Sequence, residues 1–198
     1  MGNAIQNRAT ISMGFITIAS GKFRGRKIRT PEGLCTRPLL TRLRKSLVDI
    51  LRPQLGGARV LDLFGGSGAI AFELLSNGAL SATVVELSPR AADLINLNIH
   101  DLNLEESGEV FNADGIASIA VFAGQKAEFD IIVIAPPYGQ GLQQQALDAL
   151  EHQKILAAGG TVIIQRSEDE PVSIAAGSLQ FLRTRKYGRT VFDFFGYL

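Results

Sequence analysis

Short apolar runs alternate with longer amphipathic stretches along most of the chain from Ala58 onward. The runs have the length and composition of buried strands, and each stretch between them is long enough for a helix of two or more turns. Such alternation is typical of a parallel sheet covered by helices on both faces. The expected strands are 59–63, 82–86, 109–112, 129–134 and 161–165, and the expected helices are 67–77, 89–102, 115–122 and 142–150.

Two more apolar runs, 179–186 and 190–195, flank the tripeptide Tyr187-Gly188-Arg189 near the end of the chain. They predict a hairpin that closes the sheet. With the five earlier runs they predict an α/β, Rossmann-like fold with a mostly parallel seven-stranded sheet.

The chain before Ala58 follows a different pattern. Runs 15–20 and 23–30 predict two short strands around Gly21, and leucines at helical spacing predict a helix over 40–51. Pro53 and the following glycine pair are expected to end that helix. The expected organisation is a disordered extension at 1–14, a basic hairpin and helix at 15–55, and a ligand-binding α/β domain at 56–198.

Composition excludes several protein classes. The apolar fraction of 46% and the charged fraction of 20% are ordinary for a globular domain. The single cysteine, Cys35, excludes an internal disulfide and fits a reducing cytoplasm. No apolar run is long enough to cross a membrane, and His100 and His152 are isolated from other potential metal ligands. We therefore expect a cytoplasmic protein with no metal and no membrane association. We also expect a monomer.

Positive charge is concentrated near the start of the chain, although the net charge is only +1. Residues 21–45 carry +8 and residues 46–198 carry −8. This asymmetry favours an arm that binds nucleic-acid phosphates, and the alternative is a solvated cationic face. The candidate RNA-binding residues are Lys22, Arg24, Arg26, Lys27, Arg37, Arg42 and Arg44.

Residues 60–68 place an acid at the end of the first parallel strand and a glycine-rich turn before the next helix. Ligands of open α/β sheets bind at the carboxyl ends of strands, and glycines let the backbone approach them closely. Glu86 ends the next strand, where a carboxylate commonly binds ribose hydroxyls. The candidate cofactor-binding residues here are Asp62, Phe64, Gly65, Gly66, Ser67, Gly68, Glu86 and Leu87.

The same turn also fits the looser dinucleotide fingerprint, so a nicotinamide-dependent enzyme is one alternative and a turn without a ligand is another. Asp62 favours S-adenosylmethionine. A carboxylate facing the turn would repel a pyrophosphate, but it suits the amino group and the sulfonium of S-adenosylmethionine.

The fourth parallel strand ends in Pro136-Pro137-Tyr138, which resembles the Asp/Asn-Pro-Pro-Tyr/Phe motif of methyltransferases that modify exocyclic or amide nitrogens. In those enzymes the polar side chain and the first proline carbonyl accept hydrogen bonds from the target amine, which frees its lone pair for attack on the methyl group. The aromatic ring stacks on the extruded base. Simple stiffening of the loop by two prolines is the alternative.

Ala135 stands where that motif has its acid or amide. The candidate catalytic residues, Ala135, Pro136, Pro137 and Tyr138, therefore lack the principal side-chain acceptor. Loss of one preorganised hydrogen bond commonly costs about 10²–10³ in rate. We expect a protein that binds the cofactor and transfers methyl groups slowly or not at all, because Asp130 lies too far back along the strand to replace the missing acid.

Together these motifs resemble the bacterial 16S ribosomal RNA guanine-N2 methyltransferase family (RsmD-like) over nearly the whole chain. Residues 21–28 are similar to its Arg-Gly-Arg hairpin, and residues 36–44 are similar to its Arg-Pro-Thr-x-x-Arg-Val-Arg segment. The resemblance implies a class I S-adenosylmethionine-dependent methyltransferase that acts on guanine N2. Its partner would be 16S rRNA or a small ribosomal subunit assembly intermediate.

The resemblance also places Asp114 near the adenine ring of the cofactor, while its position before a predicted helix makes it an N-cap. The chain departs from the family pattern at Ala135, at Leu39 in place of threonine, and at Lys45 in place of glutamate.

Three functions stay open on the sequence. The first is an active RNA guanine-N2 methyltransferase that relies on backbone acceptors, and the second is a catalytically silent RNA-binding homologue. The third is a DNA adenine-N6 or protein-glutamine methyltransferase. The third is disfavoured because the chain leaves little surface for a separate target-recognition domain.

Overall fold

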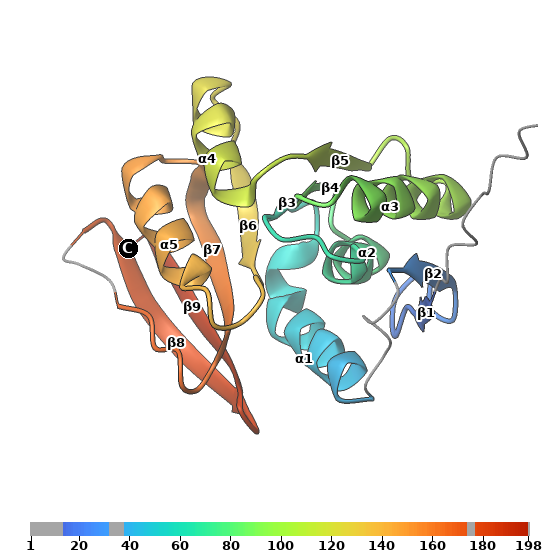
Figure 1. Cartoon of the computed structure of the whole chain (residues 1–198), viewed down its shortest axis with the longest axis horizontal. Helices are drawn as coiled ribbons and strands as arrows, with labels where there is room; N and C mark the ends of the chain where they lie inside the picture. Colours follow the sequence, from blue (N-terminus) through green and yellow to red (C-terminus); the bar gives the residue numbers. More distant parts are fainter. Residues whose placement is uncertain (1–13, 32–37, 174–176, 198) are drawn as a thin grey trace, which may run out of the picture.

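The computed structural model describes residues 14–31, 38–173 and 177–197 of the 198-residue chain. A seven-stranded sheet with the strand order β5-β4-β3-β6-β7-β9-β8 forms its centre (Figure 1). The first five strands of this sheet along the chain run parallel, and β9 lies antiparallel between β7 and β8. The strands are β3 (Arg59–Asp62), β4 (Ser81–Glu86), β5 (Gly108–Asn112), β6 (Phe129–Ile134), β7 (Leu156–Ser167), β8 (Leu179–Tyr187) and β9 (Thr190–Tyr197).

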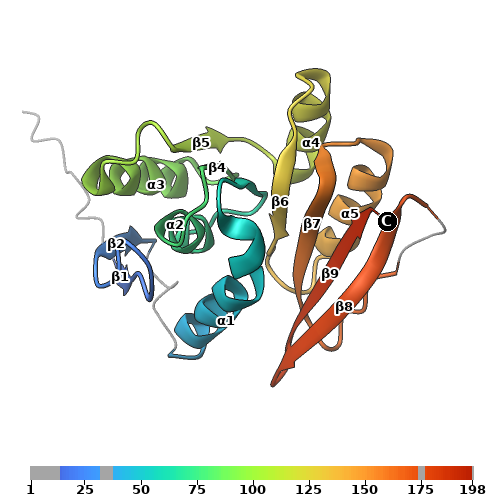
Figure 2. The same cartoon turned by 180° about the vertical axis from the view of Figure 1, so that it is seen from behind.

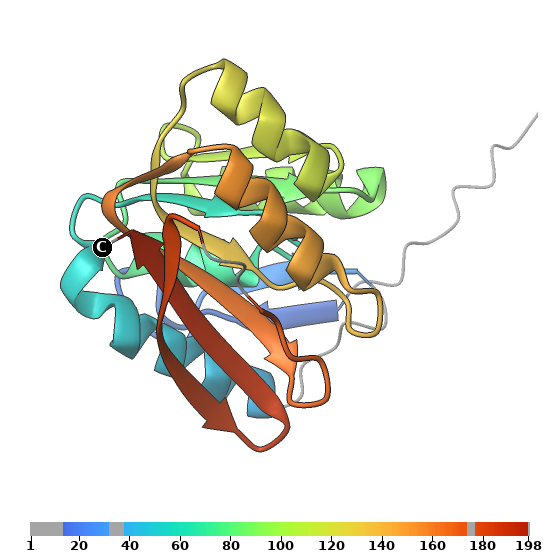
Figure 3. The same ribbon diagram turned by 90° about the vertical axis from the view of Figure 1, so that its left-hand side faces the viewer.

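Helices cover both faces of this sheet (Figures 1 and 3). Three of them contribute Leu47, Phe72 and Ile95 to one apolar core, and two contribute Ile119 and Leu147 to the other. The expected α/β, Rossmann-like fold is confirmed. The first group is α1 (Pro38–Leu55), α2 (Ala69–Ser76) and α3 (Pro89–Leu102), and the second is α4 (Gly115–Gly124) and α5 (Leu142–His152).

Apolar alternation along neighbouring strands explains why two separate cores form. Val133 and Ile163 face α1, whereas the next residues along their strands, Ile134 and Ile164, face α4 and α5. Strands buried on both faces read as continuous apolar runs, and this is why β6 was predicted at its observed bounds.

A small antiparallel hairpin, β1 (Gly14–Thr17) and β2 (Lys27–Thr30), precedes the sheet. Its strands are shorter than predicted because residues 18–26 form a compact loop, in which the Ile18 N–H donates to the Arg26 carbonyl at 3.0 Å. Gly14 belongs to β1, so the expected extension at 1–14 is one residue too long. The rest of that extension lies outside the described residues.

The hairpin packs against α2 and α3 (Figure 2). The Lys22 N–H donates to the Ser76 carbonyl at 2.7 Å, and the backbone of Arg29 exchanges two hydrogen bonds with the Asn98 side chain. A β-carbon at Gly21 would collide with the Ser76 carbonyl, so this contact requires glycine. The two-stranded unit is therefore fixed to the α/β domain through backbone hydrogen bonds.

Helix α1 is longer than expected and continues through Pro53 to Leu55. Proline removes one N–H donor, but Pro53 lies in the last turn, and both it and Asp49 are exposed, so water can satisfy the carbonyl left without a partner.

None of the helices among the described residues is long and apolar enough to cross a membrane.

Candidate functional site

The glycine-rich turn between β3 and α2 is compact. The Gly65 N–H donates to the Val85 carbonyl at 2.8 Å, and the Gly68 N–H donates to the Gly65 carbonyl at 2.7 Å. Gly68 has a φ of 74°, and a β-carbon there would lie 2.7 Å from the Phe72 ring. The turn therefore depends on glycine for both its backbone conformation and its packing.

Asp62 ends β3 directly beneath this turn and is 1% exposed. The pKa of its carboxyl is raised to about 7, mainly by burial; a hydrogen bond from the Phe64 N–H lowers the pKa, and the neighbouring Glu86 charge raises it. That bond, at 3.3 Å, is the one hydrogen bond that the Asp62 carboxylate accepts from the described residues. A buried carboxyl with so few donors is well suited to bind a cationic group.

Glu86 ends β4 beside the same turn. Its carboxylate accepts hydrogen bonds from the Gly66 N–H and the Ser88 N–H, both at 2.7 Å. Leu87 follows it on the surface and is 68% exposed. The structure thus brings Asp62, the glycine turn and Glu86 together at the carboxyl edge of the sheet.

Asp114 caps α4, because its side chain accepts a hydrogen bond from the Ala117 N–H at 2.8 Å. The N-cap interpretation is confirmed, and a role at the adenine ring stays a prediction. A β-carbon at Gly115 would collide with the Leu63 carbonyl, so the start of α4 lies close against the glycine turn.

A pocket joins this turn to the loop after β6. Ala135 and Ser67 lie in its wall together with side chains from α1, β1, β7 and β9, so the two motifs that the sequence singled out share one cavity. Sequence reasoning missed Gln165 and Phe192. The position of Gln165 was a usable signal, because it lies near the carboxyl end of the strand next to β6. The lining residues are Ile16, Leu43, Arg44, Leu47, Phe64, Gly65, Gly66, Ser67, Ala69, Ile70, Ala135, Gln165 and Phe192.

The loop after β6 presents its residues differently. Pro136 is buried, whereas Pro137 is exposed and Tyr138 is 48% exposed. The Gln165 Nε2 atom donates to the Tyr138 hydroxyl oxygen at 3.2 Å, which links the loop to β7. Asp130 lies at the opposite end of β6 and pairs with Arg59 at 3.0 Å. As expected, it cannot replace an acid at Ala135.

Most of the candidate RNA-binding cations that the structure describes are exposed. Arg26 donates to the Asp101 carbonyl at 2.6 Å, and Arg37 lies outside the described residues. A second cleft, between the hairpin loop and α1, includes Arg24 and Lys45 in its lining. The exposed candidates are Lys22, Arg24, Arg26, Lys27 and Arg42.

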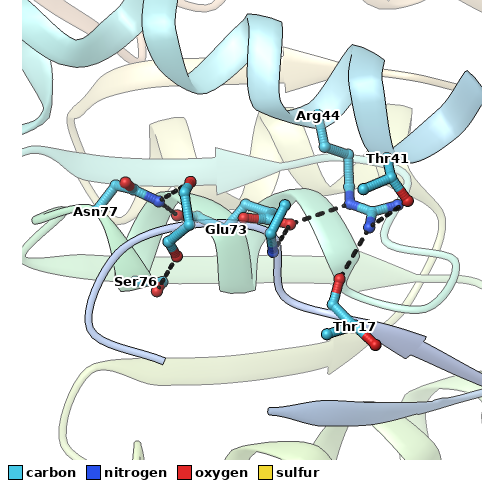
Figure 4. Close-up of polar contacts among 8 residues, drawn as sticks. Thr17, Thr41, Arg44, Glu73, Ser76 and Asn77 are labelled. Carbon is cyan, nitrogen blue, oxygen red and sulfur yellow. Dashed lines mark hydrogen bonds and ion pairs between the residues drawn. The ribbon is translucent and has the colours of Figure 1, made fainter. Parts of the chain in front are cut away.

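Arg44 departs from this group, because its side chain is only 9% exposed. Its Nε atom pairs with a Glu73 carboxylate oxygen at 3.3 Å, and its guanidinium also donates to the Thr17 carbonyl at 3.2 Å (Figure 4). The same Glu73 oxygen accepts a hydrogen bond from the Ala19 N–H. The expectation that Arg44 binds RNA is therefore corrected: this side chain is buried in a network that joins α1, α2 and the hairpin.

The model of the family described as Conserved hypothetical protein 95 matches residues 16–196. The chain belongs to this family. It is 26% identical over 173 residues to the YlbH protein of Bacillus subtilis, with 87% of this chain and 94% of that protein covered. It is 27% identical over 180 residues to ribosomal RNA small subunit methyltransferase D of Escherichia coli, with 90% and 88% covered.

A solved structure supports the same relationship. The Escherichia coli protein yhhF superposes with a TM-score of 0.81 at 25% sequence identity, over 93% of this chain and 98% of that one. The shared fold therefore extends over nearly the whole of both chains.

Proposed function

We propose that this protein is an S-adenosylmethionine-dependent methyltransferase that acts on the exocyclic N2 of a guanine in 16S ribosomal RNA. The observation that carries the proposal is the pocket shared by the glycine turn and Ala135, since a donor site and an acceptor site must adjoin for direct transfer. The name of the Escherichia coli relative, a ribosomal RNA small subunit methyltransferase, supports RNA as the substrate.

The residues at the turn fit S-adenosylmethionine. The buried Asp62 carboxyl suits its amino group, and Glu86 keeps acceptor capacity for ribose hydroxyls beyond its two backbone hydrogen bonds. A β-carbon at Gly66 would meet nothing within 4 Å, so the backbone there can be approached closely by a ligand. When bound, this cofactor supplies an electrophilic methyl group. Phe64, Gly65, Ser67, Gly68, Leu87 and Asp114 complete the proposed cofactor site.

The loop after β6 receives the target base. In this proposal the exposed Tyr138 ring stacks on the base and the Pro136 carbonyl accepts a hydrogen bond from its amine. Pro137 holds the loop rigid. The exposed cations of the hairpin and α1 bind phosphates of the RNA around the target, which sets its position without reading its sequence.

Methyl transfer to small ribosomal subunits that lack the modification tests this function. Labelled S-adenosylmethionine is incubated with the subunits and with the native protein or the Ala135→Asp variant, and the labelled nucleoside is then identified. We expect labelled N2-methylguanine from both proteins. The variant should be at least as fast as the native protein, because it carries a preorganised side-chain acceptor at the motif position.

Equilibrium binding of S-adenosylmethionine to both proteins is the control, and equal affinity shows that the substitution leaves the cofactor site intact. Cofactor binding without label from either protein would contradict the proposal and favour a catalytically silent RNA-binding protein. Label on another nucleoside, or on DNA offered in place of the subunits, would contradict the guanine assignment.

A further inference from the structure

Strand register and the pocket lining bring Gln165 close to Ala135. Ile134, the last residue of β6, pairs with Ile164 of β7. Ala135 follows directly after β6 and Gln165 is the next residue of β7, and both line the same pocket. Side chains alternate along strands, and these two belong to the face that lies against α1 rather than α5. Gln165 in turn pairs with Phe192 of β9. The residue after β6 and one residue from each of β7 and β9 thus present an alanine, a carboxamide and an aromatic ring to a single pocket.

The Gln165 carboxamide is partly oriented. Its Nε2 atom donates to the Tyr138 hydroxyl oxygen at 3.2 Å. Within the part of the chain that the structure describes, its Oε1 atom accepts no hydrogen bond from protein. Tyr138 therefore holds one end of the amide, and the acceptor end stays available to a ligand in the pocket.

We propose that the Gln165 side-chain oxygen accepts a hydrogen bond from the exocyclic amine of the target base and so replaces the acceptor that Ala135 lacks. This inference rests on the proposed function. An amide oxygen is one of the two acceptor types expected at the motif position, so a neighbouring strand can supply the same chemistry from a longer side chain.

The transfer step then balances without a further reactant. The amine nitrogen uses its lone pair to form a bond to the methyl carbon, and the carbon–sulfur bond breaks with its electron pair passing to sulfur. The products are the thioether and a methylated amine that carries one excess proton, which it releases to water. Gln165 takes no proton, because an amide is not basic; it holds an N–H group and directs the lone pair toward the methyl carbon.

Rate measurements on four proteins test the role of Gln165. They are the native chain, Gln165→Met, Ala135→Asp and the double variant, and Met is chosen because it has nearly the length of Gln without its polar atoms. We expect Gln165→Met to lower the transfer rate by about 10²-fold in the native background and by less than about tenfold in the Ala135→Asp background. Gln145→Met on the exposed face of α5 is the matched control, and its rate should equal the native rate.

A binding measurement separates this role from a merely structural one. Once the labelled guanine is located, a short RNA with guanine or inosine at that position is titrated into protein with S-adenosylhomocysteine present, since inosine lacks the 2-amino group. The native protein should bind the guanine RNA several-fold more tightly. Gln165→Met should lose most of that preference while keeping its affinity for S-adenosylhomocysteine, and Gln165→Glu, which retains an acceptor oxygen, should keep the preference.

Every other outcome contradicts either this inference or the proposed function. Equal rates for the native chain and Gln165→Met would overturn the inference, as would an unchanged preference for guanine in that variant. Transfer by Ala135→Asp with none by the native chain would overturn the inference while leaving the proposed function intact. Failure of both proteins to transfer label, with cofactor bound, would overturn the proposed function and this inference with it.

Discussion

At the scale of single residues, Asp62 has the most perturbed chemistry. Its carboxyl is buried at the end of β3, and the single described hydrogen bond, from the Phe64 N–H, compensates only part of the lost solvation. The resulting pKa of about 7 means that the neutral and ionised forms are both accessible near neutral pH. Without a ligand, the ionised form of the buried Asp62 carboxyl therefore destabilises the folded protein, and a bound cationic group would offset this effect.

Stability should depend on pH through Asp62. Its pKa is about 7 when folded and near 3.8 when unfolded, so between these values only the folded state holds the proton. The contribution of Asp62 to the free energy of unfolding should fall as pH rises from 4 to 7, by about 1.4 kcal/mol per unit, and should then level off.

The difference between the native chain and Asp62→Asn isolates this contribution, because the other carboxyl groups are common to both. Urea unfolding at pH 5 and pH 8 measures it. The native chain should lose stability relative to the variant at the higher pH. If the difference in free energy of unfolding stays constant with pH, or changes in favour of the native chain at the higher pH, burial does not raise the Asp62 pKa as proposed.

The roles of two other residues could not be predicted from the local sequence. Arg44 lies in a basic segment and was expected to face RNA, but its partner Glu73 is on another helix. Gln165 belongs to no motif, and only the pairing of β6 with β7 brings it to the pocket that Ala135 also lines. In both cases the role depends on a partner far away in the sequence.

At the scale of elements, α1 connects three parts of the molecule. It contacts α2 through Arg44 and Glu73, reaches the hairpin through the Thr17 carbonyl, and reaches the β8–β9 turn through a hydrogen bond between Ser46 and Tyr187. Because α1 also lines the pocket through Leu43, its position sets part of the shape of the candidate site.

The buried pair should contribute strongly to the stability of this arrangement. Glu73→Leu leaves the Arg44 charge buried without its carboxylate, and we expect a loss of about 3–5 kcal/mol in the free energy of unfolding. Adding Arg44→Met should recover much of that loss, because no charge is then buried. Urea denaturation of the single and double variants measures both effects.

The exposed pair of Asp49 and Arg52 on the same helix provides the control. Its removal by Asp49→Ala should change stability by about 1 kcal/mol or less, because solvent screens both charges. A loss for Glu73→Leu as small as that control, or no recovery in the double variant, would show that the buried pair does not hold the helices together.

The types of the helices and strands could be predicted from the sequence, whereas their first and last residues were predicted less well. The bounds of α3 and β6 match the prediction, since Pro89 starts a capped helix and β6 is a continuous apolar run. The strands of the hairpin were predicted too long, because residues 18–26 bond to one another and to Ser76 instead of extending the ladder. Such competition between partners is not visible in a local pattern.

At the scale of the whole molecule, the exposed positive charge is unevenly distributed. Lys22, Arg24 and Lys27 are exposed on the hairpin. By contrast, Lys186 and Arg189 on the β8–β9 hairpin pair with acidic residues. The late basic residues are thus partly neutralised, and the N-terminal hairpin is the better candidate for contact with phosphates.

Loss of one hairpin cation should weaken RNA binding equally across sequences. For Arg24→Ala we expect the slope of log affinity against log salt concentration to become shallower by about 1, since one phosphate contact and its counterion release are lost. Lys154→Ala, an exposed cation after α5, is the control and should leave the slope unchanged. An equal change in both variants would contradict a specific phosphate-binding surface on the hairpin.

Local patterns were sufficient for the fold class, the glycine turn with Asp62, and the pairing of a cofactor motif with a diproline loop. Periodicity and turn chemistry act within a few residues, and parallel strands place their carboxyl ends at a common edge. Only packing between distant segments decided that Arg44 is buried against Glu73, that α1 closes one side of the pocket, and that Gln165 lies next to Ala135. These outcomes depend on which side chains meet across elements, and burial and hydrogen bonding settle that only when the whole chain is folded.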